Sequence, residues 1–524
     1  MGIWVTLIVY LIVMLGIGFY CRKKTSDVSE FVLGGRGLGP WFTAFAYGTS
    51  YFSAVIFVGY AGKFGWNYGV ASTWIGIGNA ILGSLLAWLV LGRRTRVMTK
   101  HLDSKTMPDF FGKRYNSKTL RTLSAVIIFI FLIPYTASVY NGLSRLFEKG
   151  FGIPYKYCII GMAVITAIYV IVGGYKATAM NDFVQGVFML VGIVAVVVCV
   201  VDMKGGLSEA LESLGDIKAS NGETQQFNSI FGPDPINLLG VVILTSLGTW
   251  GLPQMVGKFY AVKDDKAIKT GTVVSTVFAI VVAGGSYFMG GFGRLFVDDV
   301  AGTPKGGFDE IVPVMMEKLP TILFGIVIVL VLSASMSTLS SLVLTSASTL
   351  TIDLIKPFVK KDMTEKKQVT IMRAFIAVFI LISVIIALIT LENPKTIIST
   401  LMSISWGALA GAFLAPFMYG LFWKGVTKAA VFASFISGVG ITIVHMLVYT
   451  MKIGDLDLPT TLSIGSQKLS LASPINAGAF AMLFSLIIVP VVSLLTKKPE
   501  KETIDEAFSC YENSDEKSLE QVKA

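Results

Sequence analysis

The stretch LSASMSTLSSLVLTSASTLTID, residues 332–353, has the residue types that could hold an ion. It contains eleven Ser or Thr residues and overlaps a 34-residue run, 319–352, without a charged side chain. Four of the hydroxyls share one side of a single helical turn: Ser337, Thr338, Ser340 and Ser341. Neutral oxygen atoms suit a small hard cation and still allow it to leave. The alternative is that these hydroxyls bond back to the preceding turn and join helices together.

A helix has few free carbonyl oxygens, so a cation site also needs an unwound segment. The run LGPWFTAFAYGTSYFSAVIFVGYAG (38–62) has Gly48 near its midpoint, and INLLGVVILTSLGTWGLPQMVG (236–257) has Pro253. Gly costs about 1 kcal/mol in a helix interior and Pro about 3 kcal/mol. A membrane helix tolerates such residues where it breaks around a cavity. We therefore predict breaks in both runs, the first at Thr49–Phe52; small residues that only permit close packing are the alternative.

The composition is that of a membrane protein. Hydrophobic residues make up 54% of the chain, charged residues 15%, and the mean hydropathy is +0.71. The four cysteines have no paired spacing, and two histidines argue against a zinc site. We expect no cofactor and no nucleic-acid partner, because the net charge of +10 comes from basic residues that orient a membrane protein.

Thirteen charge-free runs contain at least 18 residues, which is enough to cross hydrocarbon. They are 1–21, 37–62, 64–92, 122–144, 157–175, 183–201, 235–257, 270–293, 319–352, 374–391, 396–423, 429–451 and 469–496. The alternation typical of a membrane barrel is absent. We therefore predict an all-α integral membrane protein with 13 transmembrane helices.

The basic residues predict how these helices are oriented. If the C-terminal tail is cytoplasmic, 31 of the 43 Lys and Arg residues lie on the cytoplasmic side. Thirteen spans then place the N-terminus outside, in the cell membrane. The first run is followed, not preceded, by the basic cluster CRKK, so we expect a retained helix and not a signal peptide.

The two runs with predicted breaks each begin a series of five. These series cover 37–201 and 235–423, and matching broken helices are typical of inverted-repeat secondary transporters. The remaining parts are a leading helix (1–21), two trailing helices (429–496) and a cytoplasmic tail (497–524).

Two aspartates lie at the ends of apolar runs. Asp182 either marks a membrane boundary or completes a cation site with its charge, and the sequence leaves both open. Asp353 lies beside Lys356, and we expect it at the membrane edge.

Several stretches in this order resemble the sodium:solute symporter family, which includes transporters of proline, galactose, pantothenate and sialic acid. They are FVLGGRGLGPW (31–41), TMPDFFGKRY (106–115), IYVIVGGYKATAMNDFVQG (168–186), TWGLPQMVGKFYA (249–261) and SASMSTLSS (333–341). The resemblance extends from about residue 5 to about residue 450. It implies the leucine-transporter-type fold, with a leading helix, two inverted five-helix repeats and trailing helices.

The resemblance also implies ion sites. The family's shared sodium site corresponds to the carbonyls of Thr49, Phe52 and Ala334 and the hydroxyls of Ser337 and Thr338. Some members bind a second sodium through an aspartate and three serines, which correspond to Asp182, Ser337, Ser340 and Ser341. One or two sodium ions per cycle both remain open.

A solute would lie at the midplane between the two broken helices. The candidate residues are Tyr51, Ser53, Tyr135, Thr245, Thr249, Trp250, Gln254 and Trp406. The chain differs from the sodium–proline transporter at Tyr51, where that protein has an aspartate, and at Thr245 and Thr249, where it has aromatic residues. The segment TSYFSA (49–54) is more similar to the pantothenate and monocarboxylate branch. An amino acid such as proline and a pantothenate-like or monocarboxylate solute therefore both remain candidates.

The predicted function is sodium-coupled uptake of a small organic solute by alternating access, with no enzymatic activity. A proton-coupled symporter that uses Asp182 as the carrier is the alternative. A channel is disfavoured by the paired breaks, and a membrane enzyme would have to use the sparse set His101, Asp103 and Asp109. The sequence predicts neither the exact solute nor the oligomeric state.

Overall fold

The computed structural model describes residues 2–21, 27–217, 226–300, 302–359, 362–391, 398–453 and 458–511. The α-helices are α1 (Gly2–Cys21), α2 (Val28–Leu33), α3 (Pro40–Tyr51), α4 (Ala61–Tyr68), α5 (Thr73–Gly78), α6 (Arg93–His101), α7 (Met107–Arg114), α8 (Lys118–Phe151), α9 (Tyr155–Asp202), α10 (Leu207–Gly215), α11 (Pro235–Leu247), α12 (Pro253–Tyr260), α13 (Asp265–Ala279), α14 (Gly285–Gly290), α15 (Ile311–Glu317), α16 (Thr321–Thr349), α17 (Lys356–Val359), α18 (Glu365–Leu391), α19 (Ile398–Phe422), α20 (Lys428–His445) and α21 (Pro474–Leu495). The part of the predicted tail from residue 512 onward lies outside the described residues.

Shorter elements connect or extend these helices. The π-helical segments are Val55–Tyr60, Asn79–Leu86, Trp88–Gly92, Ile280–Gly284, Leu350–Ile355 and Met446–Thr450. The 3₁₀ turns are Gly34–Arg36, Gly69–Ser72, Gly248–Trp250, Gly293–Leu295 and Phe308–Glu310. Two antiparallel hairpins pair β1 (Asp299–Val300) with β2 (Thr303–Pro304), and β3 (Thr461–Ile464) with β4 (Gln467–Ser470).

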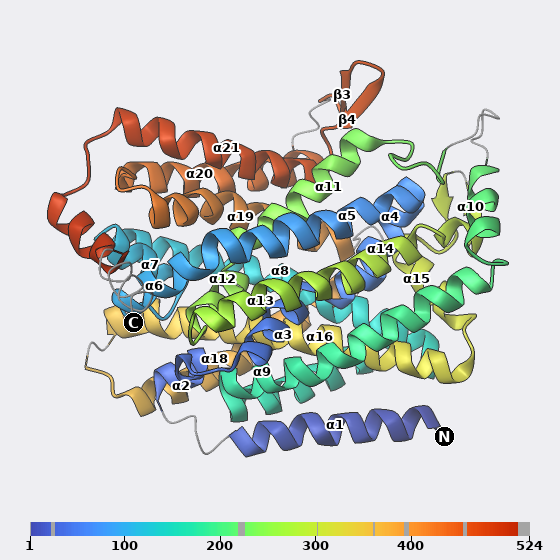
Figure 1. Ribbon diagram of the computed structural model, residues 1–524, viewed down its shortest axis with the longest axis horizontal. Coiled ribbons are helices and arrows are strands. Elements are labelled where there is room, and N and C mark those ends of the chain that lie inside the picture. Colours follow the sequence, from blue (N-terminus) through green and yellow to red (C-terminus); the bar gives the residue numbers. More distant parts are fainter. Residues whose placement is uncertain are drawn as a thin grey trace, which may run out of the picture.

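Most of the long helices run along the long axis of the molecule (Figure 1). The start of α1, helix α10 and the β3–β4 hairpin lie toward one end, which we name the hairpin end. Helices α6 and α7 lie toward the opposite end, which we name the α6–α7 end. Such a bundle places connections at its two ends, as expected for a chain that crosses a bilayer repeatedly.

Within the described ranges, ten helices are long and apolar enough to cross a membrane. The chain is therefore a multi-pass membrane protein. Ten is fewer than the thirteen charge-free runs because helical structure continues from one run into the next in Val55–His101 (47 residues) and Tyr155–Asp202 (48 residues). Each is about twice the length that crosses hydrocarbon. The second turns sharply at Gly174, where φ is 56° and ψ is −158°. The first run appears as the shorter apolar helix Leu7–Cys21.

Both predicted breaks are confirmed. Helix α3 ends at Tyr51, and Phe52 has an extended conformation with φ −97° and ψ 122°. In the other run, α11 ends at Leu247, a 3₁₀ turn follows, and Leu252 is extended before α12 begins at Pro253. Each break leaves backbone carbonyls without helical partners in the interior of the bundle.

The two broken helices run in opposite directions. Leu38, just before α3, forms a parallel β-bridge with Val262, just after α12. The start of the first broken helix therefore lies beside the end of the second. This places their breaks at a similar depth in the bundle.

Helices α16 and α19 form the centre of the bundle. In their most apolar segments 78% and 83% of residues are buried, compared with 33% in the segment Lys428–Thr450. Helix α16 contacts α3, α8 and α9, whereas α1 packs mainly on α9 at the edge (Figure 1). The hydroxyl-rich helix therefore faces other helices, which explains how it tolerates so many polar groups.

Candidate functional site

The five oxygen atoms predicted to hold sodium lie at the contact between the α3 break and α16. The Ser337 hydroxyl donates to the Thr49 carbonyl at 2.9 Å and to the Ala334 carbonyl at 3.2 Å. The Thr338 hydroxyl donates to the Phe52 carbonyl at 3.3 Å. The side chains of Thr49, Ser337 and Thr338 are fully buried. Side-chain hydroxyls from one helix thus meet the carbonyls that the break exposes.

The distances between these oxygen atoms are close to those between neighbouring oxygen ligands of a small cation. Calcium, an ion of nearly the same size as sodium, has oxygen ligands at about 2.4 Å, so neighbouring ligands in an octahedron are about 3.4 Å apart. The three oxygen–oxygen distances of 2.9, 3.2 and 3.3 Å are slightly shorter than this edge. Binding an ion here needs the hydroxyl protons to rotate away and the oxygens to separate by a few tenths of an ångström.

Two other hydroxyls of α16 follow the alternative pattern of bonding to their own helix. Ser335 donates to the Val331 carbonyl at 2.7 Å, and Ser340 donates to the Ser337 carbonyl at 2.9 Å. Such bonds satisfy the hydroxyl locally and need no ligand. The pair Ser337 and Thr338 differs because both hydroxyls reach across to α3.

The residues of the second candidate sodium site are only partly brought together. Ser341 contacts Ser50, with 2.8 Å between the hydroxyl oxygens, whereas Ser340 bonds within its helix. Asp182 is fully buried, and neither carboxylate oxygen has a hydrogen-bond partner among the described residues. Its nearest charged group is Lys258, whose Nζ lies 3.7 Å from Oδ2.

Lys258 is one of the 31 basic residues that the charge count assigns to the cytoplasmic side, but the structure buries its side chain within the bundle. It lies in α12 with 2% of its side chain exposed, and its Nζ donates to the Ser341 hydroxyl at 2.9 Å. A cavity of about 40 Å³ connects this region with Lys105 and Thr106 near α7. Among the predicted solute residues, Gln254 lies on this cavity and not with the others, and its Oε1 has no partner in the described chain.

Three of the candidate solute residues form an aromatic group beside the first break. The Tyr51 ring stacks on Trp406 with 6.3 Å between centroids, and Tyr135 meets Trp406 edge-on at 6.0 Å. Ser53 lies next to the Tyr135 hydroxyl. Trp406 also lies next to that hydroxyl, and neither Ser53 Oγ nor Trp406 Nε1 has another hydrogen-bond partner among the described residues.

The candidates on the second broken helix are largely engaged in backbone contacts. Thr249 donates to the Gly83 carbonyl at 3.1 Å, and Trp250 Nε1 donates to the Leu82 carbonyl at 2.8 Å. Thr245 bonds back within its helix, and its own carbonyl accepts the Tyr51 hydroxyl at 2.6 Å. These contacts tie the second broken helix to residues 82 and 83 and to the first broken helix.

Two further polar residues near the breaks were missed in the sequence. Asn79 is fully buried, accepts a hydrogen bond from Ser246 at 3.1 Å, and has no partner for its Nδ2 among the described residues. The Tyr287 hydroxyl is likewise buried without a described partner. The cavity beside Tyr51 and Asn79 is about 10 Å³, much smaller than an organic solute. This conformation therefore keeps the region between the breaks closed. The sequence signal that could have pointed to Asn79 is that it is a polar amide within the apolar run 64–92.

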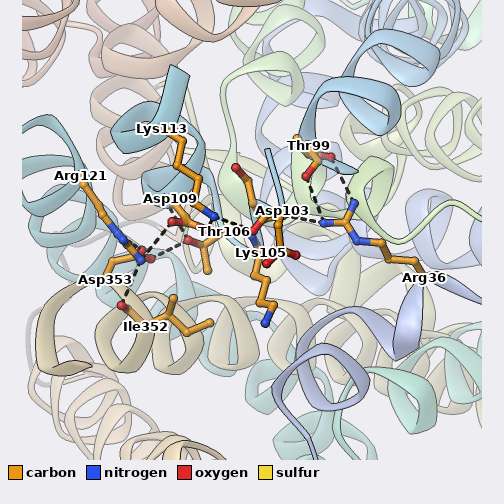
Figure 2. A network of polar contacts seen from close by, with 11 residues as sticks. Arg36, Thr99, Asp103, Lys105, Thr106, Asp109, Lys113, Arg121, Ile352 and Asp353 are labelled. Atoms are coloured by element: carbon orange, nitrogen blue, oxygen red, sulfur yellow. Dashed lines mark hydrogen bonds and ion pairs between the residues drawn. The ribbon is translucent and has the colours of Figure 1, made fainter. Parts of the chain in front are cut away.

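Ion pairs and hydrogen bonds close the α6–α7 end (Figure 2). Arg121 contacts Asp353 at 2.7 Å and Asp109 at 3.1 Å, while Thr106 donates to Asp353 at 2.6 Å. Lys113 approaches Asp109 at 3.1 Å. Asp353, expected at the membrane edge, lies in this network at one end of the bundle, and its side chain is fully buried. A cavity of about 550 Å³ adjoins it.

The three residues considered for an enzymatic centre do not form one. His101 faces the Glu506 carbonyl at 2.8 Å, whereas Asp109 is held by Arg121 and Lys113. The Asp103 carbonyl accepts a hydrogen bond from Lys113. Among the described residues, no hydrogen bond joins the His101 ring to either carboxylate.

The hairpin end has its own polar contacts. Arg145 contacts Glu310 at 3.3 Å, and Lys63 donates to the Ser399 hydroxyl at 3.1 Å. Asp309 accepts the Ile398 backbone N–H at 3.2 Å. Burial raises the pKa of the Asp309 carboxyl above its ordinary range, and the Ile398 N–H and the nearby cations only partly offset this.

A sequence model described as the Sodium:solute symporter family matches residues 31–438. The osmoregulated proline transporter OpuE of Bacillus subtilis is 29% identical over 503 residues, which cover 95% of each chain. The sodium/proline symporter of Escherichia coli is 30% identical over 447 residues, covering 83% of this chain and 86% of that protein. Among solved structures, a Na+-coupled sialic acid symporter in a substrate-bound outward-open state superposes with a TM-score of 0.72 at 15% identity, covering 96% of this chain and 99% of the other.

Proposed function

The chain belongs to the sodium:solute symporter family, and on this premise we propose that it couples sodium entry to the uptake of proline. Membership of this family makes the chain a sodium-coupled transporter and not an enzyme. The proposed sodium site consists of Thr49, Phe52 and Ala334 carbonyls with the Ser337 and Thr338 hydroxyls. The observation that carries this assignment is that Ser337 and Thr338 reach the α3 break at 2.9 and 3.3 Å.

Sodium at this position would bridge two parts of the bundle. The α3 break and α16 each supply some of the ligands, so an ion binds tightly only while the two are close together. Coupling requires this difference in affinity between conformations, because an ion that binds all states equally shifts none of them. One sodium ion that moves down about 100 mV and a tenfold gradient supports roughly 500-fold solute accumulation.

The proposed layout has 13 spans, with two inverted repeats at 37–201 and 235–423, a leading helix and two trailing helices. The start of the first broken helix lies beside the end of the second, and α3 packs against α12, which supports an inverted relationship. The length of Tyr155–Asp202 and its turn at Gly174 support two crossings within that helix. The proposed orientation has the α6–α7 end in the cytoplasm and the N-terminus outside.

Proline is the proposed solute because the related transporters of Bacillus subtilis, Escherichia coli and Staphylococcus aureus carry that name. The aromatic group of Tyr51, Tyr135 and Trp406 suits its chemistry: a compact apolar ring with a cationic secondary amine can pack against aromatic faces. The Ser53 hydroxyl and Trp406 Nε1, which have no partner other than the Tyr135 hydroxyl among the described residues, could donate to the carboxylate. The differences at Tyr51, Thr245 and Thr249 indicate that the ring is held by other contacts than in the sodium–proline transporter.

The test is uptake of radiolabelled proline into proteoliposomes with an inward sodium gradient. Choline replaces sodium at fixed pH as the control, and pantothenate, lactate and sialic acid serve as competitors. We expect proline accumulation that requires sodium and that only proline-like compounds inhibit. Accumulation driven by a proton gradient in choline would refute sodium coupling, and inhibition by pantothenate but not proline would refute the proposed solute.

A further inference from the structure

The second candidate cation position in this chain already contains a positive charge. Lys258 Nζ lies 2.9 Å from the Ser341 hydroxyl and 3.7 Å from Asp182 Oδ2. Asp182 and Ser341 are two of the four residues that correspond to the second sodium site. The ammonium group therefore occupies the space between ligands that would otherwise surround a sodium ion.

The surroundings hold this ammonium in place. The Lys258 and Asp182 side chains are 2% and 1% exposed, and the Tyr175 ring faces Nζ with 5.1 Å to its centroid. Ser341 is in turn fixed by Ser50, with 2.8 Å between the hydroxyl oxygens. A buried ammonium needs an opposite charge and hydrogen-bond acceptors, and this pocket supplies both.

We propose that Lys258 acts as a tethered cation in the second site, so the transporter carries one sodium ion per cycle and not two. A sodium ion between Asp182 and Ser341 would meet the ammonium at close range, and like charges in a buried site repel strongly. Without sodium, the Asp182 carboxylate is already balanced by Lys258. The other two residues of the site support this, because Ser340 bonds within α16 and Ser337 faces the first sodium site.

The inference rests on the proposed function for its sodium chemistry but adds a specific stoichiometry. It predicts that Lys258→Met opens the second site, because the variant leaves Asp182 buried with an uncompensated charge beside the Ser341 hydroxyl. The double variant Lys258→Met with Asp182→Asn removes both charges and closes the site again. Lys263→Met, which changes an exposed lysine just after α12, is the matched control.

The experiment measures equilibrium binding of ²²Na⁺ to the purified chain in detergent, without solute. We expect one sodium per chain for the wild type and Lys263→Met, two for Lys258→Met, and one for the double variant. In proteoliposomes, the reversal potential of proline transport should correspond to one charge per proline in the wild type and two in Lys258→Met.

Two results would overturn the inference. One is a wild type that binds two sodium ions, which needs no variant at all. The other is a Lys258→Met chain that binds one sodium ion although thermal unfolding and gel filtration show that it is folded. If Lys258→Met does not fold, the number of sodium ions bound by the wild type and by Lys258→Gln tests the inference instead. Failure of the proposed function gives a different result, since a chain that is not sodium-coupled binds no sodium in the wild type.

Discussion

Replacing Ser337 and Thr338 by alanine tests the proposed sodium site where α16 meets the α3 break. Each substitution removes one of five proposed oxygen ligands and leaves the carbonyls of Thr49 and Phe52 in place. Both residues lie within α16, and without an ion their hydroxyls satisfy carbonyls that the α3 break exposes. A bound sodium ion would contact those carbonyls instead, so the main effect on uptake should come from the lost ligands.

The expected magnitude follows from the strength of hydrogen bonds to charged groups, about 1.5–3 kcal/mol, used here for a hydroxyl facing an ion. A loss of about 2 kcal/mol weakens binding roughly 30-fold. Water entering the vacated space reduces this loss, and neighbouring ligands are not additive. We expect the sodium concentration for half-maximal uptake to rise at least about tenfold for each single variant and about 100-fold for the double variant.

The assay is initial proline uptake into proteoliposomes as a function of external sodium at constant ionic strength. The matched control is Ser335→Ala, a fully buried hydroxyl on the same helix that bonds to its own Val331 carbonyl. It should change the sodium requirement less than about threefold, because it contacts no proposed ligand. Unchanged sodium dependence in the double variant, or an equal change in Ser335→Ala, would refute the assignment.

Three further predictions concern other parts of the chain. Arg121→Met leaves the buried Asp353 carboxylate unpaired and should lower the free energy of unfolding by about 3–5 kcal/mol, with partial recovery when Asp353→Asn is added; an unchanged thermal midpoint would contradict this. Trp406→Ala should raise the KM for proline at least about tenfold without changing ²²Na⁺ binding, while the exposed Trp41→Ala should change neither; an unaltered KM would remove Trp406 from the solute site. Because burial raises the pKa of Asp309, its folded state holds a proton more strongly than its unfolded state, so stability should fall as pH rises from about 4. Thermal unfolding of Asp309→Asn should lack this component, and identical pH profiles would disprove it.

The helix breaks could be predicted because their causes are local. Gly48 and Pro253 disfavour a continuous helix wherever they occur, and the structure breaks within four residues of Gly48 and immediately before Pro253. The spacing of Ser337 and Thr338 likewise places both on one helix face, although hydroxyl spacing alone could not separate them from Ser335 and Ser340. That difference depends on which side of α16 meets α3, a property of packing.

The charged residues show what the sequence alone does not reveal. Lys258 and Asp353 each follow a long apolar run, which indicates a membrane boundary but not whether the charge is buried. In the structure each finds an opposite charge from a distant segment: Asp182 for Lys258 and Arg121 for Asp353. Burial of a charge depends on such a partner, and single-sequence patterns do not reveal it.

The number of long helices differs from the number of charge-free runs because the two counts divide the chain differently. A count of runs divides the chain at every charged residue, whereas helical hydrogen bonding continues past charged residues and, in α9, past the turn at Gly174. Lys176 and Asp182 separate two runs in the sequence but lie within one helix in the structure, just after the turn at Gly174. The two criteria therefore give thirteen runs and ten long helices from the same residues.

The most direct test is a pair of structures of the purified chain, one in sodium chloride and one in choline chloride, at a resolution that shows bound ions. The account predicts a sodium-dependent density peak in contact with the Thr49 and Phe52 carbonyls and the Ser337 and Thr338 hydroxyls. It would be contradicted if the two maps were identical there, with both hydroxyls still bonded to those carbonyls in saturating sodium.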